Sequence, residues 1–205
     1  LLLHRYSGQE QFSVGAPVAG RDRPELEPLI GFFVNSLVFR ADLAGEPSFR
    51  ELLRRVRETA LGAYAHQDLP FEMIVDAVQP PRDMSHTPIF QVMFTLQTDR
   101  DAPAAAGPLR LETVEVHSAT SKFDLSLYLT DSEAELGGAL EYSTALLDAA
   151  TIARLAGHYQ ALLEAVVAAP DQPIGTLNML TAAERQQLLI DWNATALPFP
   201  ADSTI

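Results

Sequence analysis

The sequence of 205 residues lacks cysteine, and its only lysine is Lys122. Without cysteine, the chain can form no disulfide, no thiolate nucleophile and no cysteine-ligated zinc site. Basic residues are also scarce, because 14 of them stand against 27 acidic residues. The resulting net charge of −13 repels nucleic acid and anionic lipid. We therefore expect no nucleic-acid partner.

Membrane and export signals are equally absent. No apolar run approaches the roughly 20 residues that a membrane helix needs. The opening residues, LLLHRYSGQ, contain no basic leader of the kind found in signal peptides. The hydrophobic fraction of 47% is ordinary for a globular domain. These observations predict a cytoplasmic protein without a membrane partner.

The common motifs of enzyme active sites are missing as well. There is no HExxH zinc motif, no GxSxG nucleophile elbow, no P-loop and no GxGxxG after a strand. The five histidines lie too far apart in the sequence to suggest a metal-binding pair: His4, His66, His86, His117 and His158. The sequence therefore predicts no metal site and no directly bound cofactor, and it identifies no catalytic residue.

Hydrophobic periodicity predicts a mixture of strands and helices. Strand-like segments occur at residues 12–18, 32–39, 90–96, 109–116, 123–129 and 136–142. Residues 1–5 resemble the end of a helix whose beginning is missing, and further helices are expected after Ser48, Pro70, Asp148 and Thr181. Since strands and helices do not alternate regularly, we expect an α+β fold with a mixed sheet.

Capping signals and composition indicate where a structured region ends and a linker begins. Ser48 with Glu51, and Thr181 with Glu184, match the S/T-x-x-E capping box. Asp68 is the expected N-cap of the helix after Pro70. The tail is rich in proline, alanine, threonine and serine, as in interdomain linkers. We therefore predict a structured region at residues 1–175 and a linker at residues 176–205.

Two groups of charged residues have alternative explanations. Arg54, Arg55 and Arg57 form either a docking patch for an acidic partner or phosphate, or simply the solvated face of a helix. The second explanation is favoured. Arg82 and Asp83 follow a Pro-Pro break and are expected to form a structural pair or turn rather than a catalytic one.

Two other polar residues invite a functional explanation. His66 is either a base or carrier-contact residue, or a cation at the C-terminus of a helix, and we favour the helix cation. Asn35 lies among phenylalanine and valine, so its amide needs specific hydrogen bonds. It either satisfies backbone groups or faces a cavity, and the sequence leaves both open.

Three segments carry recognisable motifs. Residues 30–36 are IGFFVNS, residues 66–72 are HQDLPFE, and residues 82–89 are RDMSHTPI. In this order, they resemble the (I/V)GxFVNT, (H/N)QDxPFE and RDxSRNPL motifs of condensation domains in nonribosomal peptide synthetases. Residues 180–193 are similar to the linker between condensation and adenylation domains, so the resemblance covers essentially the whole chain.

The sequence departs from the family pattern in three places. Ser36 replaces the usual threonine and keeps its hydroxyl, whereas His86 and Thr87 replace the usual Arg-Asn. The family's HHxxxDG motif, which carries the base tied to amide formation, is absent. The resemblance therefore implies the C-terminal lobe of a condensation domain, without the lobe that holds the base.

The family's fold and activity follow as expectations. The resemblance implies a chloramphenicol-acetyltransferase-like lobe that forms one wall of a tunnel, where a carrier-bound amine attacks a carrier-bound thioester. The implied partners are the N-terminal lobe, donor and acceptor carrier domains with their phosphopantetheine arms, and a downstream adenylation domain. The setting would be secondary metabolism, such as antibiotic biosynthesis. The fragment alone is predicted to be inactive.

The resemblance also implies a role for each motif residue. Asn35 and Ser36 are candidates to face the substrate tunnel, and the three arginines are candidates for carrier docking. A structural role is implied for Gly31, His66, Asp68, Pro70, Arg82, Asp83 and Ser85. Segments that cross to the other lobe are expected within residues 14–35 and 113–121.

Three alternative functions remain open. A stand-alone acyltransferase that uses coenzyme A would need its own HHxxxDG motif, which the sequence lacks. A non-catalytic docking or scaffold lobe would bind partners without chemistry. An epimerisation domain has a similar fold, but the tail of this chain resembles a connection to adenylation.

Overall fold

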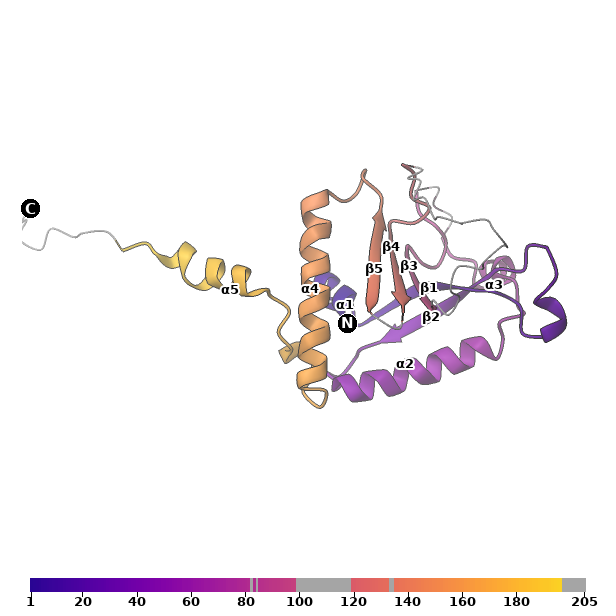
Figure 1. Cartoon of the computed structure of the whole chain (residues 1–205), viewed down its shortest axis with the longest axis horizontal. Coiled ribbons are helices and arrows are strands. Elements are labelled where there is room, and N and C mark those ends of the chain that lie inside the picture. Colours follow the sequence, from indigo (N-terminus) through magenta and orange to yellow (C-terminus); the bar gives the residue numbers. More distant parts are fainter. Residues whose placement is uncertain (82, 84, 99–118, 133–134, 197–205) are drawn as a thin grey trace, which may run out of the picture.

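The computed structural model describes residues 1–81, 83, 85–98, 119–132 and 135–196, and it shows a five-stranded mixed sheet with helices beside it (Figure 1). The strands lie in the order β2-β1-β3-β4-β5. Their bounds are β1 Gln11–Val18, β2 Asn35–Asp42, β3 Val92–Thr98, β4 Leu125–Asp131 and β5 Leu136–Tyr142. The helices are α1 Leu2–Ser7, α2 Phe49–Tyr64, α3 Phe71–Val78, α4 Ala149–Ala168 and α5 Ala182–Leu189, with short 3-10 turns η1 Pro24–Leu26, η2 Ile174–Thr176 and η3 Asp191–Asn193. The predicted α+β fold is confirmed.

The sheet consists of two ribbons joined by a narrow seam. β1 and β2 pair antiparallel from Gln11–Asp42 to Val18–Asn35. On the other side, β3 pairs parallel with β4 and β4 pairs antiparallel with β5, each along the whole strand. Between the ribbons, β1 and β3 run parallel and share a single pair, Gly15 with Met93. The pairing also fixes which side chains share a face, because paired residues point the same way.

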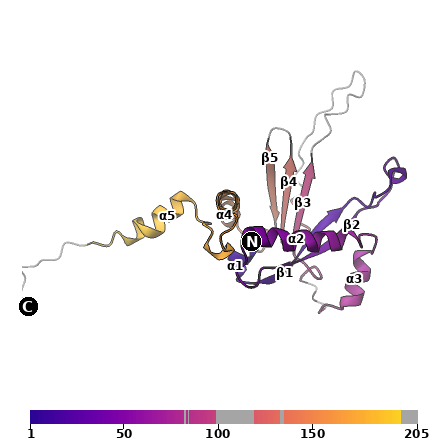
Figure 2. The same cartoon turned by 90° about the horizontal axis from the view of Figure 1, so that it is seen from below.

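Helices α2 and α4 cover one face of the sheet (Figures 1 and 2). The Ser48 hydroxyl accepts a hydrogen bond from the Glu51 amide at the start of α2, and Asp148 accepts one from the Thr151 amide at the start of α4. Apolar side chains of both helices meet those of the strands and of the segment after α4. The main core cluster contains Leu43, Leu52, Leu162, Val166, Ile174 and Leu177.

The opposite face of the sheet carries smaller and more polar residues. The register places Gly15, Met93, Ser126 and Glu141 in one row across the central and edge strands. Ser36 lies on the same face, opposite Pro17. In the part of the chain that the structure describes, α2 and α4 both lie on the first face, and of the helices only α3 approaches this second face, at one end (Figure 2).

A cluster of three phenylalanines covers that end of the second face. Phe90, which is 2% exposed, lies 5.4 Å from Phe71 of α3 and 5.5 Å from Phe123, measured between ring centroids. Its ring rests on Gly15, where an added Cβ would overlap the ring. The hydroxyl of Ser126 is fully buried on this face and has no hydrogen-bond partner among the described residues.

Several local expectations need correction. The strand expected at residues 32–39 begins at Asn35, because the preceding glycine and phenylalanines belong to an exposed loop. Asp68 does not cap α3, whose N-cap position is Pro70. Ser48 accepts its capping bond, but the Glu51 carboxylate pairs with arginines instead of returning to the Ser48 amide. The box at Thr181 and Glu184 is complete.

We predicted that a segment within residues 14–35 crosses to the other lobe, and this is wrong for the first and last residues of that range. Val14 to Val18 and Asn35 belong to β1 and β2, which pair with each other inside the sheet. Only the loop between them, residues 19–34, extends beyond the sheet (Figure 1). The strand expected at 109–116 and most of the crossover expected at 113–121 lie outside the described residues.

Replacing Gly15 with alanine tests the packing of Phe90 against β1. The new methyl group would overlap the buried ring, so we expect G15A to lower the free energy of unfolding by about 2 kcal/mol or more, measured by urea denaturation. Gly62 of α2 is the matched control, since an added Cβ there meets nothing within 4 Å. G62A should raise stability by about 0.5–1 kcal/mol. Equal effects of the two changes would contradict the packing.

Candidate functional site

The side chain of Asn35 joins the first motif to the second. Its Nδ2 group donates hydrogen bonds to the carbonyl oxygens of Gln67 and Leu69, both at 2.8 Å. Its Oδ1 atom accepts from the backbone N–H groups of Ser36 at 2.9 Å and Phe71 at 3.2 Å. These four bonds use the full capacity of a primary amide. Of the two explanations that the sequence left open, the structure supports the one in which Asn35 satisfies backbone groups.

This amide also supplies the cap that α3 lacks locally. Pro70 has no side chain that can accept a hydrogen bond, and no side chain of the neighbouring sequence caps the helix. The Asn35 oxygen reaches the Phe71 N–H from 36 residues away. Sequence reasoning placed the cap at Asp68 because capping rules consider only adjacent residues. A cap supplied from another strand leaves no local signal.

His66 and Asp68 both lie on the surface of the same loop. The His66 Nδ1–H group donates to the carbonyl oxygen of Gly62 at 2.9 Å, in the last turn of α2. The contact places His66 at the C-terminal end of α2, and its role there as a cation stays a prediction. Asp68 is exposed, as is Pro70. The loop is therefore held by backbone contacts to Asn35 rather than by its own charged side chains.

Ser36 points away from Asn35, since consecutive residues of a strand face opposite sides. Asn35 is directed to the loop before α3, whereas Ser36 lies on the second face of the sheet with Pro17, Gly15 and Met93. The two candidates for the substrate tunnel are therefore separated by the backbone. That either residue faces a tunnel stays a prediction.

The third motif ends beside the other two. The Thr87 hydroxyl of the third motif donates to the carbonyl oxygen of Phe90, which directly follows the motif. The Phe90 ring packs on Phe71 of the second motif. All three motifs thus converge at one end of the sheet. Sequence reasoning missed Gly15, Phe90 and Ser126, because their importance comes from a contact between distant segments. Gly31 lies in the exposed loop before β2.

Asp83, Ser85 and His86 form an exposed hydrogen-bonded turn. The Ser85 hydroxyl donates to Asp83 at 2.7 Å and lies 2.7 Å from the Nδ1 atom of His86, which is 3.1 Å from the other Asp83 oxygen. The Ser85 bonds, chiefly that of its hydroxyl, lower the pKa of Asp83. In a catalytic triad, serine and aspartate contact different ring nitrogens. Here, both contact the same one, which supports a structural turn. Arg82 lies outside the described residues.

The three arginines of α2 differ in their partners. Arg54 pairs with Glu51 at 2.7 Å and Glu58 at 2.6 Å, and Arg55 pairs with Glu51 at 3.1 Å. Hydrogen bonds from Arg54 and then Arg55 lower the pKa of Glu51 to about 2. Arg57 is exposed and makes no hydrogen bond or ion pair with the described residues. Of the three, only Arg57 therefore offers an uncommitted cation on this helix.

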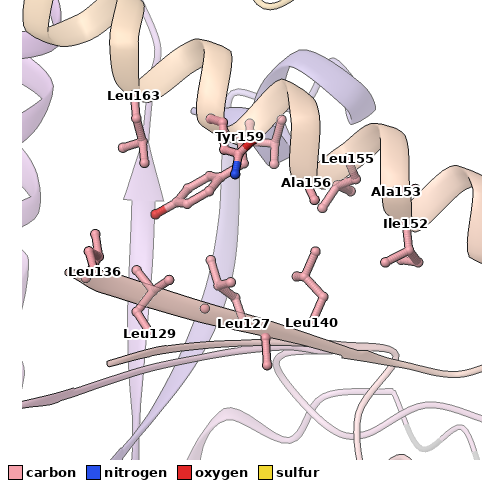
Figure 3. A pocket seen from close by; sticks show the side chains of 14 residues that line it. Leu127, Leu129, Leu136, Leu140, Ile152, Ala153, Leu155, Ala156, Tyr159 and Leu163 are labelled. Atoms are coloured by element: carbon pink, nitrogen blue, oxygen red, sulfur yellow. The ribbon is translucent and has the colours of Figure 1, made fainter. Parts of the chain in front are cut away.

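A separate apolar groove of about 400 Å³ lies between α4 and strands β4 and β5 (Figure 3). Its walls are mainly aliphatic, and Tyr159 is the only ionisable side chain among the described residues that line it. The residues that line it include Leu127, Leu129, Leu136, Leu140, Ile152 and Leu163. Apart from the Tyr159 hydroxyl, the described lining provides no acid, base or nucleophile. The described residues also contain no cluster of histidine and carboxylate side chains suited to a metal ion.

Exchanging Asn35 for aspartate tests the four-bond anchor. The change keeps the shape but removes both Nδ2 donors and sets a negative charge beside two carbonyl oxygens. We expect N35D to lower the free energy of unfolding by about 2–3 kcal/mol in urea denaturation. Asn178 is exposed and donates to one carbonyl, so N178D should change stability by less than about 1 kcal/mol. An N35D loss no larger than that of N178D would refute the anchor.

None of the helices among the described residues is long and apolar enough to cross a membrane.

The chain resembles several large peptide synthetases along its whole length. It is 51% identical over 207 residues to one of the linear gramicidin synthase proteins of Brevibacillus parabrevis, covering 100% of this chain and 4% of that protein. It is 46% identical to malpibaldin synthetase of Mortierella alpina, again covering 100% of this chain and 4% of the relative. The chain therefore spans about 4% of the length of these relatives.

Solved structures agree with the sequence relatives. The X-domain from teicoplanin biosynthesis, in complex with OxyB, superimposes with a TM-score of 0.75 at 32% identity over 88% of this chain and 40% of that one. A holo four-domain nonribosomal peptide synthetase superimposes with a TM-score of 0.79 at 25% identity over 89% of this chain and 15% of that one. The family model of the condensation domain matches residues 1–189. The chain therefore belongs to the condensation domain family of nonribosomal peptide synthetases.

Proposed function

We propose that this chain is the C-terminal lobe of a condensation domain that forms an amide bond between two carrier-bound substrates. The donor is an aminoacyl or peptidyl thioester, and the acceptor is an amino acid. The acceptor nitrogen bonds to the donor carbonyl carbon, and the carbon–sulfur bond breaks. A base takes the amine proton, and the sulfur leaves as the thiol of the donor carrier's phosphopantetheine arm once it is protonated. The convergence of the three motifs at one end of the sheet is the observation that carries this proposal.

The lobe contributes shape rather than proton transfer in this scheme. The sequence contains no HHxxxDG motif, so the base must come from another lobe. Positioning alone is a large part of catalysis when both substrates are tethered. The second face of the sheet, with Ser36 and the row from Gly15 to Glu141, is the wall that we assign to the substrate tunnel.

The loop at residues 19–34 is the surface that we assign to contact with the N-terminal lobe. Ile30 and Phe32 are almost fully exposed, and Val34 is half exposed. Arg21 stacks on the Phe33 ring, with its guanidinium carbon 4.4 Å from the ring centroid, so the loop has an ordered base. Exposed apolar side chains gathered in one place favour burial against a partner.

A carrier domain would dock on the outer side of α2. This helix exposes Leu53, Val56, Leu61 and Tyr64, with Arg57 among them. Apolar contacts with one cation at their edge suit a partner that has an apolar surface and a phosphate or carboxylate. Arg54 and Arg55, which were equal candidates in the sequence, are neutralised by Glu51 and Glu58. Phosphopantetheine would arrive on this carrier.

The C-terminal segment would lead to an adenylation domain. At the end of α5 and just beyond it, the side chains of Leu189, Ile190 and Trp192 are exposed and available to such a partner. The proposed boundary between lobe and linker, at residue 175, stays a prediction. Leu177 is only 2% exposed and packs in the main core, which supports a boundary slightly further along the chain. We place the whole synthetase in the cytoplasm.

The purified chain should have no condensation activity. Supplied with loaded donor and acceptor carriers, it should give no amide product above background in a mass-spectrometric assay, because it lacks the base. Adding a separately produced N-terminal lobe that contains HHxxxDG should restore turnover. Product from the chain alone would contradict the assignment of shape without catalysis. A scaffold or epimerisation domain would give no condensation product after the lobes are combined.

Substitution of Arg57 tests the docking surface in the complete synthetase module. Charge reversal at the edge of an interface mainly slows association. We expect R57E to raise the apparent KM for one carrier about tenfold, with kcat unchanged, in assays at low ionic strength. R54Q is the matched control on the same helix, and its KM should change less than twofold, since Arg54 is already paired. If the two variants raised the apparent KM equally, the assignment of Arg57 to the docking interface would be wrong.

A further inference from the structure

A polar network at the start of α5 lies outside the three sequence motifs. His158 is 7% exposed and sits among the buried residues of α4, at positions otherwise held by Ile152, Leu155, Leu162 and Val166. A buried imidazole is costly unless both ring nitrogens have partners. Its Nδ1 atom lies 2.6 Å from the hydroxyl oxygen of Tyr6, and its Nε2 atom lies 2.9 Å from both carboxylate oxygens of Glu184.

The chemistry of the partners fixes the direction of each bond. Burial is the main cause that raises the pKa of Tyr6. The hydrogen bond from the Thr181 amide is the main cause that lowers the pKa of Glu184. At neutral pH, Tyr6 is therefore protonated and Glu184 is a carboxylate. Tyr6 donates to Nδ1, and the Nε2–H group donates to Glu184. Both ring nitrogens of His158 thus have partners among the described residues.

The three residues come from three different elements. Tyr6 belongs to α1, His158 to α4 and Glu184 to α5. Arg154 is the other charged group that acts on Tyr6, and it lies one turn from His158. Arg5 of α1 adds bonds to the carbonyl oxygens of Ile174 at 3.3 Å and Leu177 at 2.9 Å. Helix α1 thus holds the segment before α5 directly and α5 itself through His158.

The attachment of α5 to the lobe is narrow. Leu177 is buried and Met179 packs against the main core, but no residue of α5 is buried. At the beginning of α5, Thr181 lies beside Gly157 of α4, where an added Cβ would make an ordinary contact of 3.4 Å with the Thr181 methyl group. Beyond this point, α5 extends away from the lobe (Figure 1). Firm packing therefore ends near Met179, and the bond between His158 and Glu184 is the principal contact that follows.

We propose that Tyr6, His158 and Glu184 form a latch that holds α5 against α4, and that breaking it lets α5 pivot about residues 179–181. The contact is polar and buries no side chain of α5, so it can open without exposing the core. Its opening would change the direction in which the linker leaves the lobe. This inference concerns the described residues alone and does not depend on the proposed reaction.

Distance measurement between α4 and α5 tests the latch. Because the natural chain has no cysteine, spin labels at Glu164→Cys and Gln187→Cys would be the only ones present. Both positions are exposed. Double electron–electron resonance on the otherwise unchanged chain should give one narrow distance distribution. His158→Phe should add a second population and raise the open fraction about tenfold, as expected for loss of a hydrogen bond to a carboxylate.

Two further variants make the result decisive. Tyr159→Phe removes a hydroxyl from the neighbouring position of α4 and should leave the distribution unchanged. Glu184→Gln keeps an acceptor for the capping box but removes the charge, so the open fraction should rise about threefold. If His158→Phe fails to fold, as judged by circular dichroism, the open fraction of Glu184→Gln alone tests the latch. A distribution identical to that of the unsubstituted protein in every folded variant of His158 and Glu184 would overturn the latch.

Discussion

The amide of Asn35 is the interaction on which the arrangement of this fold depends. It satisfies the carbonyl groups of Gln67 and Leu69 and the N–H groups of Ser36 and Phe71. Without it, the loop between α2 and α3 would have no fixed position relative to the sheet, and α3 would begin without a cap. Phe71 would then lose its place against Phe90, and the cover over Gly15 would be lost with it. One side chain thereby sets both the backbone of the second motif and the packing of the third.

The sequence was informative wherever structure depends on local rules. The helices at Ser48, Asp148 and Thr181 begin where their caps predict, since a hydroxyl or carboxylate there accepts the expected N–H. The strands at β1 and β5 were found from their side-chain patterns and flanking turns. The family could be identified because its motifs are contiguous stretches of sequence. These features require no knowledge of what lies nearby in space.

Features that depend on distant contacts could not be predicted. The beginning of β2 is set by its pairing with Val18, whereas the apolar residues before Asn35 suggested an earlier start. The cap of α3 comes from another strand. Nothing near Gly15 in the sequence indicates that a phenylalanine ring rests on it. Likewise, His158 occupies a helix position that could have held an aliphatic residue, and its two partners lie 152 and 26 residues away.

The seam between the two ribbons of the sheet has a mechanical consequence. Every other neighbouring pair of strands is joined along its full length, but β1 and β3 share only the pair of Gly15 with Met93. A sheet bends at the lowest cost where the fewest hydrogen bonds must distort. The sheet should therefore bend most easily along this line, where the Phe90 ring packs on Gly15.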